Sequence, residues 1–439
     1  MLSVALFCIL DGKRSPSQWY KAARELEPCR LLGLGIEPAR STWYHFRNRS
    51  SKFIASIHEQ IVQQAIQENL VQASEGCLDG TFVNASASRH RRFDLTKIST
   101  RLNILKRAIV QIDKVPQVAA RAKLLETPYW LARTPMGRQR QLKQYRDAKL
   151  QILNELRQNR DLPASFKRNE DAITVSPADP EAVIGRDKKH TTRPLYNVQY
   201  MTDFDVDFIL AYGVFRKKND TGTLIPMIQT TQDIVLGRLN RVHADGGYCS
   251  LLELQDSKRV GIDLYAPVPV RSGSKRRPTE SGKEQLSHDR FSWEESTKTM
   301  TCPSGHSMRR TSRSKDPRAD DRYVIELRFE QSETLCQVCP LKAQCLSKQA
   351  RRRTVRRFEE QHLLDEQKQK MSTLKGKASQ KRRREMVERM HGDSKTHRNG
   401  DDFCGRGLNL ATTETGLMVV AQNCFLIQKL RKSKIKPPT

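Results

Sequence analysis

The chain has 439 residues, of which 37% are hydrophobic, and its 78 Lys or Arg against 49 Asp or Glu give a formal charge of +29. This charge predicts a polyanionic partner, above all nucleic acid, because Lys and Arg gain affinity by displacing counterions from phosphates. No apolar run approaches the roughly 18 residues needed to span a bilayer, which argues against a membrane protein. Ten cysteines scattered through so long a chain are unlike a small disulfide scaffold and favour a reducing compartment.

The first 72 residues are expected to be helical. Leu2 to Leu10 is an apolar run that is short and lacks a preceding basic segment, so a buried helix is preferred over a secretion signal. Ser15, followed by Pro16 and Gln18, has the pattern of a capping box at a helix start. The segment IEPARSTWYHFRNR predicts a short basic helix, for which DNA contact and a solvated surface both stay open.

A mixed pattern of strands and helices follows. CLDGTFV reads as a strand, and long polar helices between residues 97 and 170 then interrupt the strand pattern, most clearly in QLKQYRDAKLQILNELRQ. YNVQYMT and DFILAYGVF predict an antiparallel pair, and RVHA predicts a short strand that ends near Asp245. These elements predict the α/β class, a sheet with helices on its faces, in two to three domains or in one domain enlarged by insertions.

Four cysteines lie in a later segment, residues 271–350, which begins with a Ser-, Gly-, Lys- and Arg-rich loop or boundary. Cys302 belongs to the short motif CPSGH, and CQVCPLKAQC contributes Cys336, Cys339 and Cys345. Four thiols in two such groups could bind Zn²⁺ tetrahedrally, although the last spacing is looser than in common zinc ribbons. The alternative is a core in which these thiols only pack.

The C-terminal segment, residues 351–439, begins as a basic stretch predicted to be helical. Residues 351–398 contain 16 Lys or Arg and 7 Asp or Glu. Arg384, Glu388, His391 and Lys395 are spaced so that all four would share one side of a helix. The apolar helix GLMVVAQNCFLIQKL is expected to pack under the sheet, with Asn423 in a buried hydrogen bond.

Three carboxylates could converge on divalent metal. Asp79 and Asp245 each end a short apolar run and precede glycine, and Glu388 lies on the basic helical stretch. Taken singly, Asp79 and Asp245 read as turn residues and Glu388 as a surface ion pair. Only their combination with the strand context predicts a metal site, and Asp203 and Asp220 are interpreted as structural.

These blocks resemble, in their order, the DDE transposases of bacterial insertion sequences, which belong to the superfamily with the ribonuclease H-like fold. The resemblance rests on LDGT, YNVQ, ADGGY, the cysteine segment, VERMHGDSK and GRGL. Arg384, Glu388 and Lys395 match the spacing of the family signature, whereas Lys381 and His391 stand where tyrosine and phenylalanine are usual. The implied architecture has a ribonuclease H-like core in residues 73–270 and 351–439, insertions at about 97–170 and 271–350, and an N-terminal region, 1–72, that could bind DNA ends.

The resemblance also implies chemistry and partners. Asp79, Asp245 and Glu388 would hold two Mg²⁺ or Mn²⁺ ions that cleave double-stranded DNA at a transposon end and then join its 3′ hydroxyl to target DNA. Arg384 and Lys395 would grip terminal phosphates, with Arg389 and Arg406 as weaker candidates. A homodimer assembled on DNA and a cytoplasmic, nucleoid-associated location in bacteria are expected.

Three functional hypotheses remain open at this point. The first is an active cut-and-paste transposase. The second is a DNA-binding protein that has lost catalysis, favoured by Lys381 and by the start of the chain at an apolar helix. The third is a hydrolytic nuclease of the same fold that never joins strands.

Overall fold

The computed structural model describes the whole chain except residues 163, 188–189, 270–284, 287–289, 316–323 and 436–439. The predicted boundary at residue 271 therefore lies outside the described residues. The chain divides into two compact units. The first contains Met1–Tyr248, Ile262–Tyr265 and Ala378–Thr439, and the second contains Cys249–Gly261 and Ala266–Lys377.

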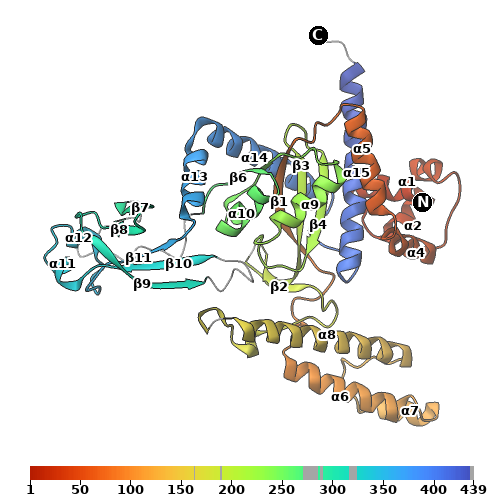
Figure 1. Cartoon of the computed structure of the whole chain (residues 1–439). Coiled ribbons are helices and arrows are strands. Elements are labelled where there is room, and N and C mark those ends of the chain that lie inside the picture. Colours follow the sequence, from red (N-terminus) through yellow and green to blue (C-terminus); the bar gives the residue numbers. More distant parts are fainter. Residues whose placement is uncertain (163, 188–189, 270–284, 287–289, 316–323, 436–439) are drawn as a thin grey trace. The chain divides into compact units, whose positions relative to one another are not determined.

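A six-stranded mixed sheet forms the centre of the first unit (Figure 1). Its strands are β1 (Glu75–Asn84), β2 (Val183–Arg186), β3 (Thr192–Asp203), β4 (Ile209–Phe215), β5 (Arg241–His243) and β6 (Asp263–Tyr265). The order is β2-β3-β1-β5-β6, with β4 also paired to β3. β3 is antiparallel to β1 and β4, while β5 is parallel to both β1 and β6, so the predicted α/β class is confirmed.

The predicted N-terminal helices are present. They are α1 (Leu2–Leu10), α2 (Pro16–Glu25), α3 (Glu27–Leu32), α4 (Arg40–Ser50) and α5 (Ile54–Gln67). The capping box of Ser15 and Gln18 is formed at the start of α2, as predicted. The first helix buries Val4, Ala5 and Cys8, which confirms the expectation of a buried helix.

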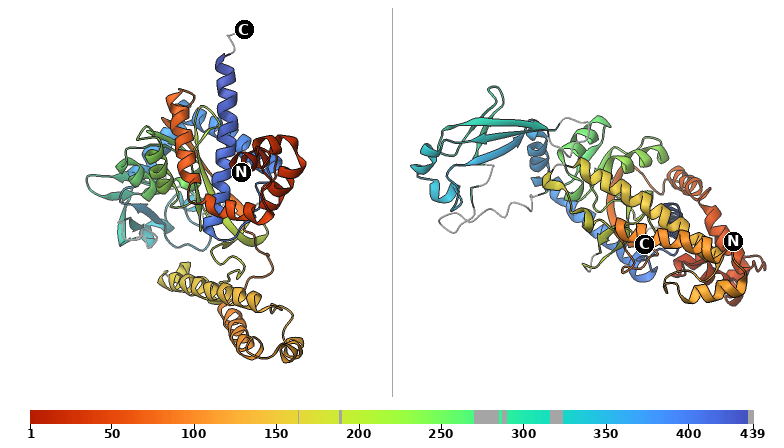
Figure 2. Two further views of the ribbon diagram at one scale, coloured as in Figure 1. Left: turned by 90° about the vertical axis from the view of Figure 1, so that its right-hand side faces the viewer. Right: turned by 90° about the horizontal axis from the view of Figure 1, so that it is seen from below.

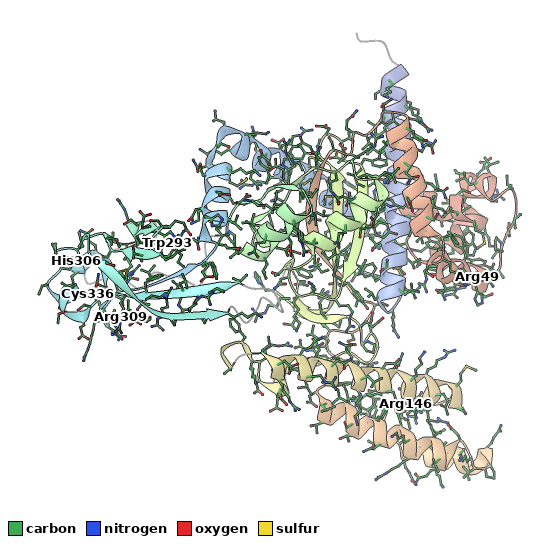
Figure 3. All side chains as sticks on the ribbon, viewed as in Figure 1. Arg49, Arg146, Trp293, His306, Arg309 and Cys336 are labelled. Atoms are coloured by element: carbon green, nitrogen blue, oxygen red, sulfur yellow. The ribbon has the colours of Figure 1, made fainter. Side chains whose placement is uncertain are left out.

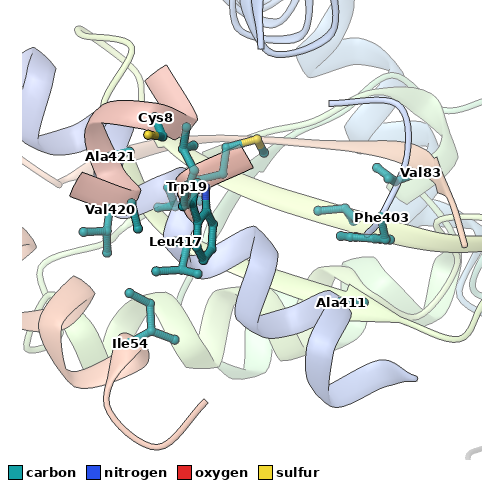
Figure 4. Packing of buried hydrophobic residues seen from close by; sticks show 14 of the residues in the cluster. Cys8, Trp19, Ile54, Val83, Phe403, Ala411, Leu417, Val420 and Ala421 are labelled. Atoms are coloured by element: carbon teal, nitrogen blue, oxygen red, sulfur yellow. The ribbon is translucent and has the colours of Figure 1, made fainter. Parts of the chain in front are cut away.

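One hydrophobic cluster joins these helices to the sheet and to the last helix, α15 (Leu408–Ile435). Figure 4 shows Trp19, Ile54 and Leu417 in this cluster. The helix contacts α1, α5, β3 and β4, in agreement with the predicted packing against the sheet. Asn423 makes the expected buried hydrogen bonds, because its side chain accepts from the Ile209 N–H at 3.0 Å and donates to the Ile209 carbonyl at 2.8 Å.

Within the part of the chain that the structure describes, α15 is the helix that is long and apolar enough to cross a membrane by length and composition. However, 67% of its most apolar window is buried inside the protein. Burial of this kind is what the core helix of a folded unit shows, so the helix is weak evidence of a membrane span.

Helices α6 (Leu95–Ile112), α7 (Gln117–Leu125) and α8 (Pro135–Asp161) follow β1. Figures 1 and 2 show α6 and α8 side by side, and they share a hydrophobic cluster of their own. That cluster contains the apolar positions predicted for α8: Leu142, Tyr145, Ala148, Ile152 and Leu156. Arg138 of α8 also pairs with Asp113 at the end of α6. The short helices η1 (Ala164–Phe166) and η2 (Glu170–Ala172) follow α8. Helix α9 (Leu224–Ile234) lies elsewhere in the unit, against β3, β4 and α5.

The second unit contains a five-stranded antiparallel sheet in the order β11-β10-β9-β8-β7. Its elements are α10 (Leu251–Arg259), β7 (Ser292–Glu294), β8 (Thr299–Thr301), β9 (Ser307–Lys315), β10 (Ile325–Glu330), α11 (Glu333–Gln337), α12 (Lys342–Cys345), β11 (Thr354–Phe358) and α13 (Gln361–Ser372). The prediction of helices from residue 351 is wrong for β11. Val355 and Phe358 are buried there, and β11 pairs with β10, a neighbour that local sequence does not reveal.

Candidate active site

Two predicted carboxylates lie close together beside neighbouring parallel strands. Cys77 of β1 pairs with His243, the last residue of β5. Asp79 lies two residues further along β1, and Asp245 lies two residues beyond the end of β5, so both follow that pair by the same number of residues. The structure therefore brings together the two aspartates that the sequence singled out.

The electrostatics of Asp245 confirm this proximity. Burial raises its pKa, and the negative charges of Asp79 and Asp220 raise it further. The Gly247 N–H, which donates to Asp245 at 2.6 Å, and the nearby Arg383 guanidinium lower it. A cation in addition to Arg383 would further offset the cost of keeping these neighbouring carboxylates charged in a buried place.

Asp220 is a third carboxylate at this place, and sequence reasoning missed it by interpreting it as structural. Its Oδ1 accepts hydrogen bonds from Asn197 at 3.0 Å and from Gln199 at 2.8 Å. The Tyr248 hydroxyl donates to Gln199. Burial is the main cause that raises the pKa of this hydroxyl, and the negative charges of Asp220, Asp79 and Asp245 raise it further. A signal was present in YNVQ, because two buried polar residues spaced by two share one face of β3 and need a polar partner.

Two glycines allow the carboxylates to approach the backbone closely. A Cβ at Gly80 would lie 2.7 Å from Asp220 Oδ1 and 2.2 Å from the Gln199 amide nitrogen. A Cβ at Gly247 would lie 2.9 Å from Asp245 Oδ1 and 3.7 Å from Asp220 Oδ2. The glycines that follow both aspartates in the motifs therefore make room for this cluster.

Helix α14 (Leu374–Gly392) docks on the sheet beside Asp245. Ser379 hydrogen-bonds His243 at 2.7 Å, and Gln380 donates to the carbonyls of Ala244 and Tyr265 at 3.2 Å each. Side chains of this helix therefore hold the ends of the two parallel strands β5 and β6.

Arg383 is the α14 residue that meets the aspartates. Its Nη1 lies 3.1 Å from Asp79 Oδ1, and both side chains are largely buried. Glu388, which was predicted to be the third carboxylate, is exposed, as is Arg384. Since each residue of an α-helix turns by about 100°, Glu388 lies about 140° around the axis from Arg383. The structure does not bring Glu388 to Asp79 and Asp245.

The predicted common helical side is only partly present. Arg384, Glu388 and His391 lie within α14, but Lys395 lies in η5, the π-helical turn Asp393–His397. A π-helical turn has a different number of residues per turn, so the four-residue spacing no longer places Lys395 on that side. Its Nζ pairs with Asp401 at 3.2 Å.

The two weaker DNA-binding candidates also have partners within the protein. Arg389 pairs with Asp207 at 3.2 Å, and Arg406 donates to the Ser86 carbonyl at 2.9 Å. Arg406 and Arg389 both stay at the surface. Neither contact prevents a phosphate contact, because exposed pairs of this kind are weak.

DNA contact and a solvated surface both stay open for the exposed side of the basic N-terminal helix α4. Trp43 and Arg47 are buried, and Arg47 pairs with Glu414 of α15 at 3.3 Å. Arg40 and Arg49 are exposed; Figure 3 labels Arg49. One side of the helix is therefore core, and the other side offers cations to solvent or to a ligand.

Among the described residues, no group of three or more His, Cys, Asp or Glu side chains is close enough in its present conformation to hold a metal ion. The donors at the aspartate cluster nevertheless fit a hard cation, since Mg²⁺ and Mn²⁺ prefer carboxylate oxygens. Cys302, Cys336, Cys339 and Cys345 lie elsewhere, in the second unit, where all four line one pocket.

Neighbouring carboxylates beside a mixed sheet and next to a basic helix are a set of donors that suits a hard divalent cation. A comparison points to one family, since residues 301–430 match the family model described as "Transposase DDE domain". This match supports a DDE transposase, a family that generally uses divalent metal ions and acts on DNA. It includes Glu388 and the four pocket cysteines, and Asp79 and Asp245 lie outside it.

No curated protein and no solved structure matches the chain.

Proposed function

We propose that the protein is a transposase that binds the ends of an insertion sequence in double-stranded DNA, cleaves there, and transfers the 3′ strand to target DNA. The observation that carries this proposal is the proximity of Asp79, on β1, and Asp245, just beyond the end of the adjacent strand β5, beside a basic helix. The mixed sheet flanked by helices supports a ribonuclease H-like core.

In this proposal, Asp79 and Asp245 hold the metal ions through their carboxylate oxygens. Bound Mg²⁺ or Mn²⁺ supplies positive charge at the attacking and leaving oxygens of the phosphodiester. Asp220 keeps the Asn197 and Gln199 amides in place beside the cluster, and its own carboxylate adds negative charge that favours cation binding. Arg384 and Lys395 hold terminal phosphates and so orient the DNA end.

Glu388 remains our proposed third metal ligand, because it matches the family signature and lies within the matched residues. To reach the aspartates, α14 would have to turn about its axis, and Arg383 would then leave Asp79. In the present arrangement the Arg383 guanidinium lies beside Asp79, and after the rotation a metal ion would take its place. A positive charge therefore stays beside Asp79 before and after α14 turns. Two copies on paired ends, in the bacterial cytoplasm, complete the proposal.

The test uses purified protein, labelled transposon ends and Mg²⁺. Wild-type protein should yield joined products. Asp79→Asn and Asp245→Asn should each lower cleavage on the order of 10³-fold or more and preserve end binding, because each removes a metal ligand and no basic contact. The matched control is Asp147→Asn, an exposed carboxylate on α8, which should cut at the wild-type rate.

Three outcomes would contradict parts of the proposal. Cutting retained by Asp79→Asn would exclude the aspartate site. Binding without cleavage by wild-type protein would indicate a DNA-binding protein that has lost catalysis, and nicks without joining would indicate a hydrolytic nuclease. Glu388→Gln tests the third ligand separately, since full activity in that variant would leave only the strand aspartates.

A further inference from the structure

Two separate segments of the second unit present cysteine side chains to one pocket. The first is the turn between β8 and β9, where the Cys302 N–H donates to the His306 carbonyl and the Gly305 N–H donates to the Cys302 carbonyl, both at 2.9 Å. Gly305 has a φ of +81°, a left-handed conformation that glycine adopts without strain. The turn therefore fixes Cys302 at the pocket wall.

The second segment, from α11 to α12, contributes the other three cysteines. Cys336 lies on α11, and Cys339 follows at the start of a turn in which the Lys342 N–H donates to the Cys339 carbonyl at 3.0 Å. Helix α12 then ends at Cys345. The C-x2-C spacing of Cys336 and Cys339 is typical of zinc sites, and Cys345 and Cys302 would complete the set at looser spacings.

The four thiols share one environment. Cys302, Cys336, Cys339 and Cys345 line the same pocket, together with His306 and Arg353. Figure 3 labels His306 and Cys336 in this part of the unit. The four side chains therefore border a common space.

Hydrogen-bond donors already face these sulfurs. The Arg353 backbone N–H bonds to the Cys336 thiol, and the Gln331 amide lies 3.7 Å from Cys302 Sγ. The Ser304 hydroxyl lies 2.9 Å from Cys339 Sγ. Donors of this kind stabilise metal-bound thiolates in zinc sites.

The surrounding core is small, which gives a cross-link a structural purpose. Its buried residues are Phe291, Met300, Met308, Leu327, Phe329 and Val355, with Cys302 and Cys345 packed against them. A hydrophobic cluster of this size contributes little stability, and small units of this kind commonly use a metal or a disulfide. All four cysteines are free here.

We propose that Cys302, Cys336, Cys339 and Cys345 bind one Zn²⁺ in a closed tetrahedral site that stabilises the five-stranded sheet and the helices α11 and α12. Zn–S bonds of about 2.3 Å require the thiol side chains to turn from their present rotamers toward the pocket centre. The site is structural, because four protein ligands leave no position open for water or substrate. It does not depend on the proposed transposase activity.

The experiment measures zinc in the full-length protein after purification under reducing conditions. Elemental analysis should find about one Zn²⁺ per chain in wild-type protein and in Cys404→Ser, a matched loss of an exposed thiol outside the pocket. Cys339→Ser and Cys345→Ser should lose most of the metal. Wild-type protein without zinc, or a disulfide between two pocket cysteines in the reduced preparation, would overturn the proposal.

A second measurement on wild-type protein covers the case in which the serine variants do not fold. Alkylation of the thiols, followed by mass spectrometry, should modify the four pocket cysteines slowly with zinc present and at least about tenfold faster after chelation. Cys404 should react at the same rate in both states. Equal rates at the pocket cysteines with and without chelator would also overturn the proposal.

Discussion

Buried histidines hold neutral rings in the first unit. His58 lies between α5 and β4, where its Nε2 hydrogen-bonds the Ile209 carbonyl at 3.1 Å, so that nitrogen carries the proton and donates. His243 stacks on Phe204 at 3.6 Å between ring centroids and links Ser379 of α14 to Glu75 of β1. Burial lowers the pKa of each ring from 6.5 to about 4.

The lowered pKa of His58 predicts a loss of stability in acid. The unfolded chain binds a proton at His58 near pH 6.5 and the folded chain only near pH 4. The stability that comes from burying a neutral His58 ring is therefore complete above pH 6.5 and is lost as the pH falls toward 4. Between pH 7 and 4.5, the free energy of unfolding of wild-type protein should fall by about 2 kcal/mol more than that of His58→Gln.

Urea unfolding at several pH values checks this difference, with His45→Gln, an exposed histidine on α4, as the control. The comparison between variants matters because burial raises the pKa values of Asp179 and Asp203, which act in the opposite direction. Parallel pH profiles for wild type and His58→Gln would show that the buried ring does not contribute in this way.

At the residue scale, the sequence predicted Asp79 and Asp245 because each follows an apolar run and precedes glycine, a pattern local to a few residues. It could not place Asp220, whose partners Asn197 and Gln199 come from a strand 21 or more residues away. The sequence prediction also did not set the rotation of α14, where the apolar signal is only Met386 and Met390, four residues apart. Both are buried in the structure and lie on the same side of the helix as Arg383, which is why Arg383 rather than Glu388 meets Asp79.

Among the elements, α4 and α15 are joined by a buried ion pair. Arg47 and Glu414 lie 3.3 Å apart, with side-chain exposures of 8% and 4%. Glu414 also accepts from the backbone N–H groups of Cys404 at 2.8 Å and Gly405 at 2.7 Å. A carboxylate so placed ties the loop before α15 to the N-terminal helices.

Arg47→Met should destabilise the first unit by about 3 kcal/mol, because it removes the ion-pair partner of the buried Glu414 carboxylate and leaves the charge of Arg14 as partial compensation. The double variant Arg47→Met, Glu414→Leu should recover part of that loss. Urea unfolding measures both, and Arg431→Met, at the exposed pair with Glu68, should change stability far less. If Arg47→Met were as stable as wild type, water or another group would have to stabilise the buried charge of Glu414.

Elements were predictable from sequence where the pattern is local and long. The spacing in α8 and the capping box of α2 are examples, and both are confirmed. β11 was missed because its TVRRF sequence lies within a long basic stretch, and its strand form depends on pairing with β10.

For the whole molecule, the formal charge of +29 is the property that reaches furthest from any single site. Binding to double-stranded DNA releases counterions, so the logarithm of the affinity falls with the logarithm of salt concentration by about 0.9 for each neutralised phosphate. Net charge alone does not identify the side chains that contact phosphates. A comparison of variants with the same net charge can identify them.

Arg384→Gln with Lys395→Gln should make this salt dependence shallower by about two units of slope, since two proposed phosphate contacts are lost. Arg24→Gln with Lys298→Gln removes the same charge from exposed pairs with Glu37 and Glu295 and should alter the slope much less. Fluorescence anisotropy of a labelled transposon end at several salt concentrations measures both slopes. Equal slopes in the two double variants would show that binding follows total charge, and Arg384 and Lys395 would then lose their assigned role at the DNA end.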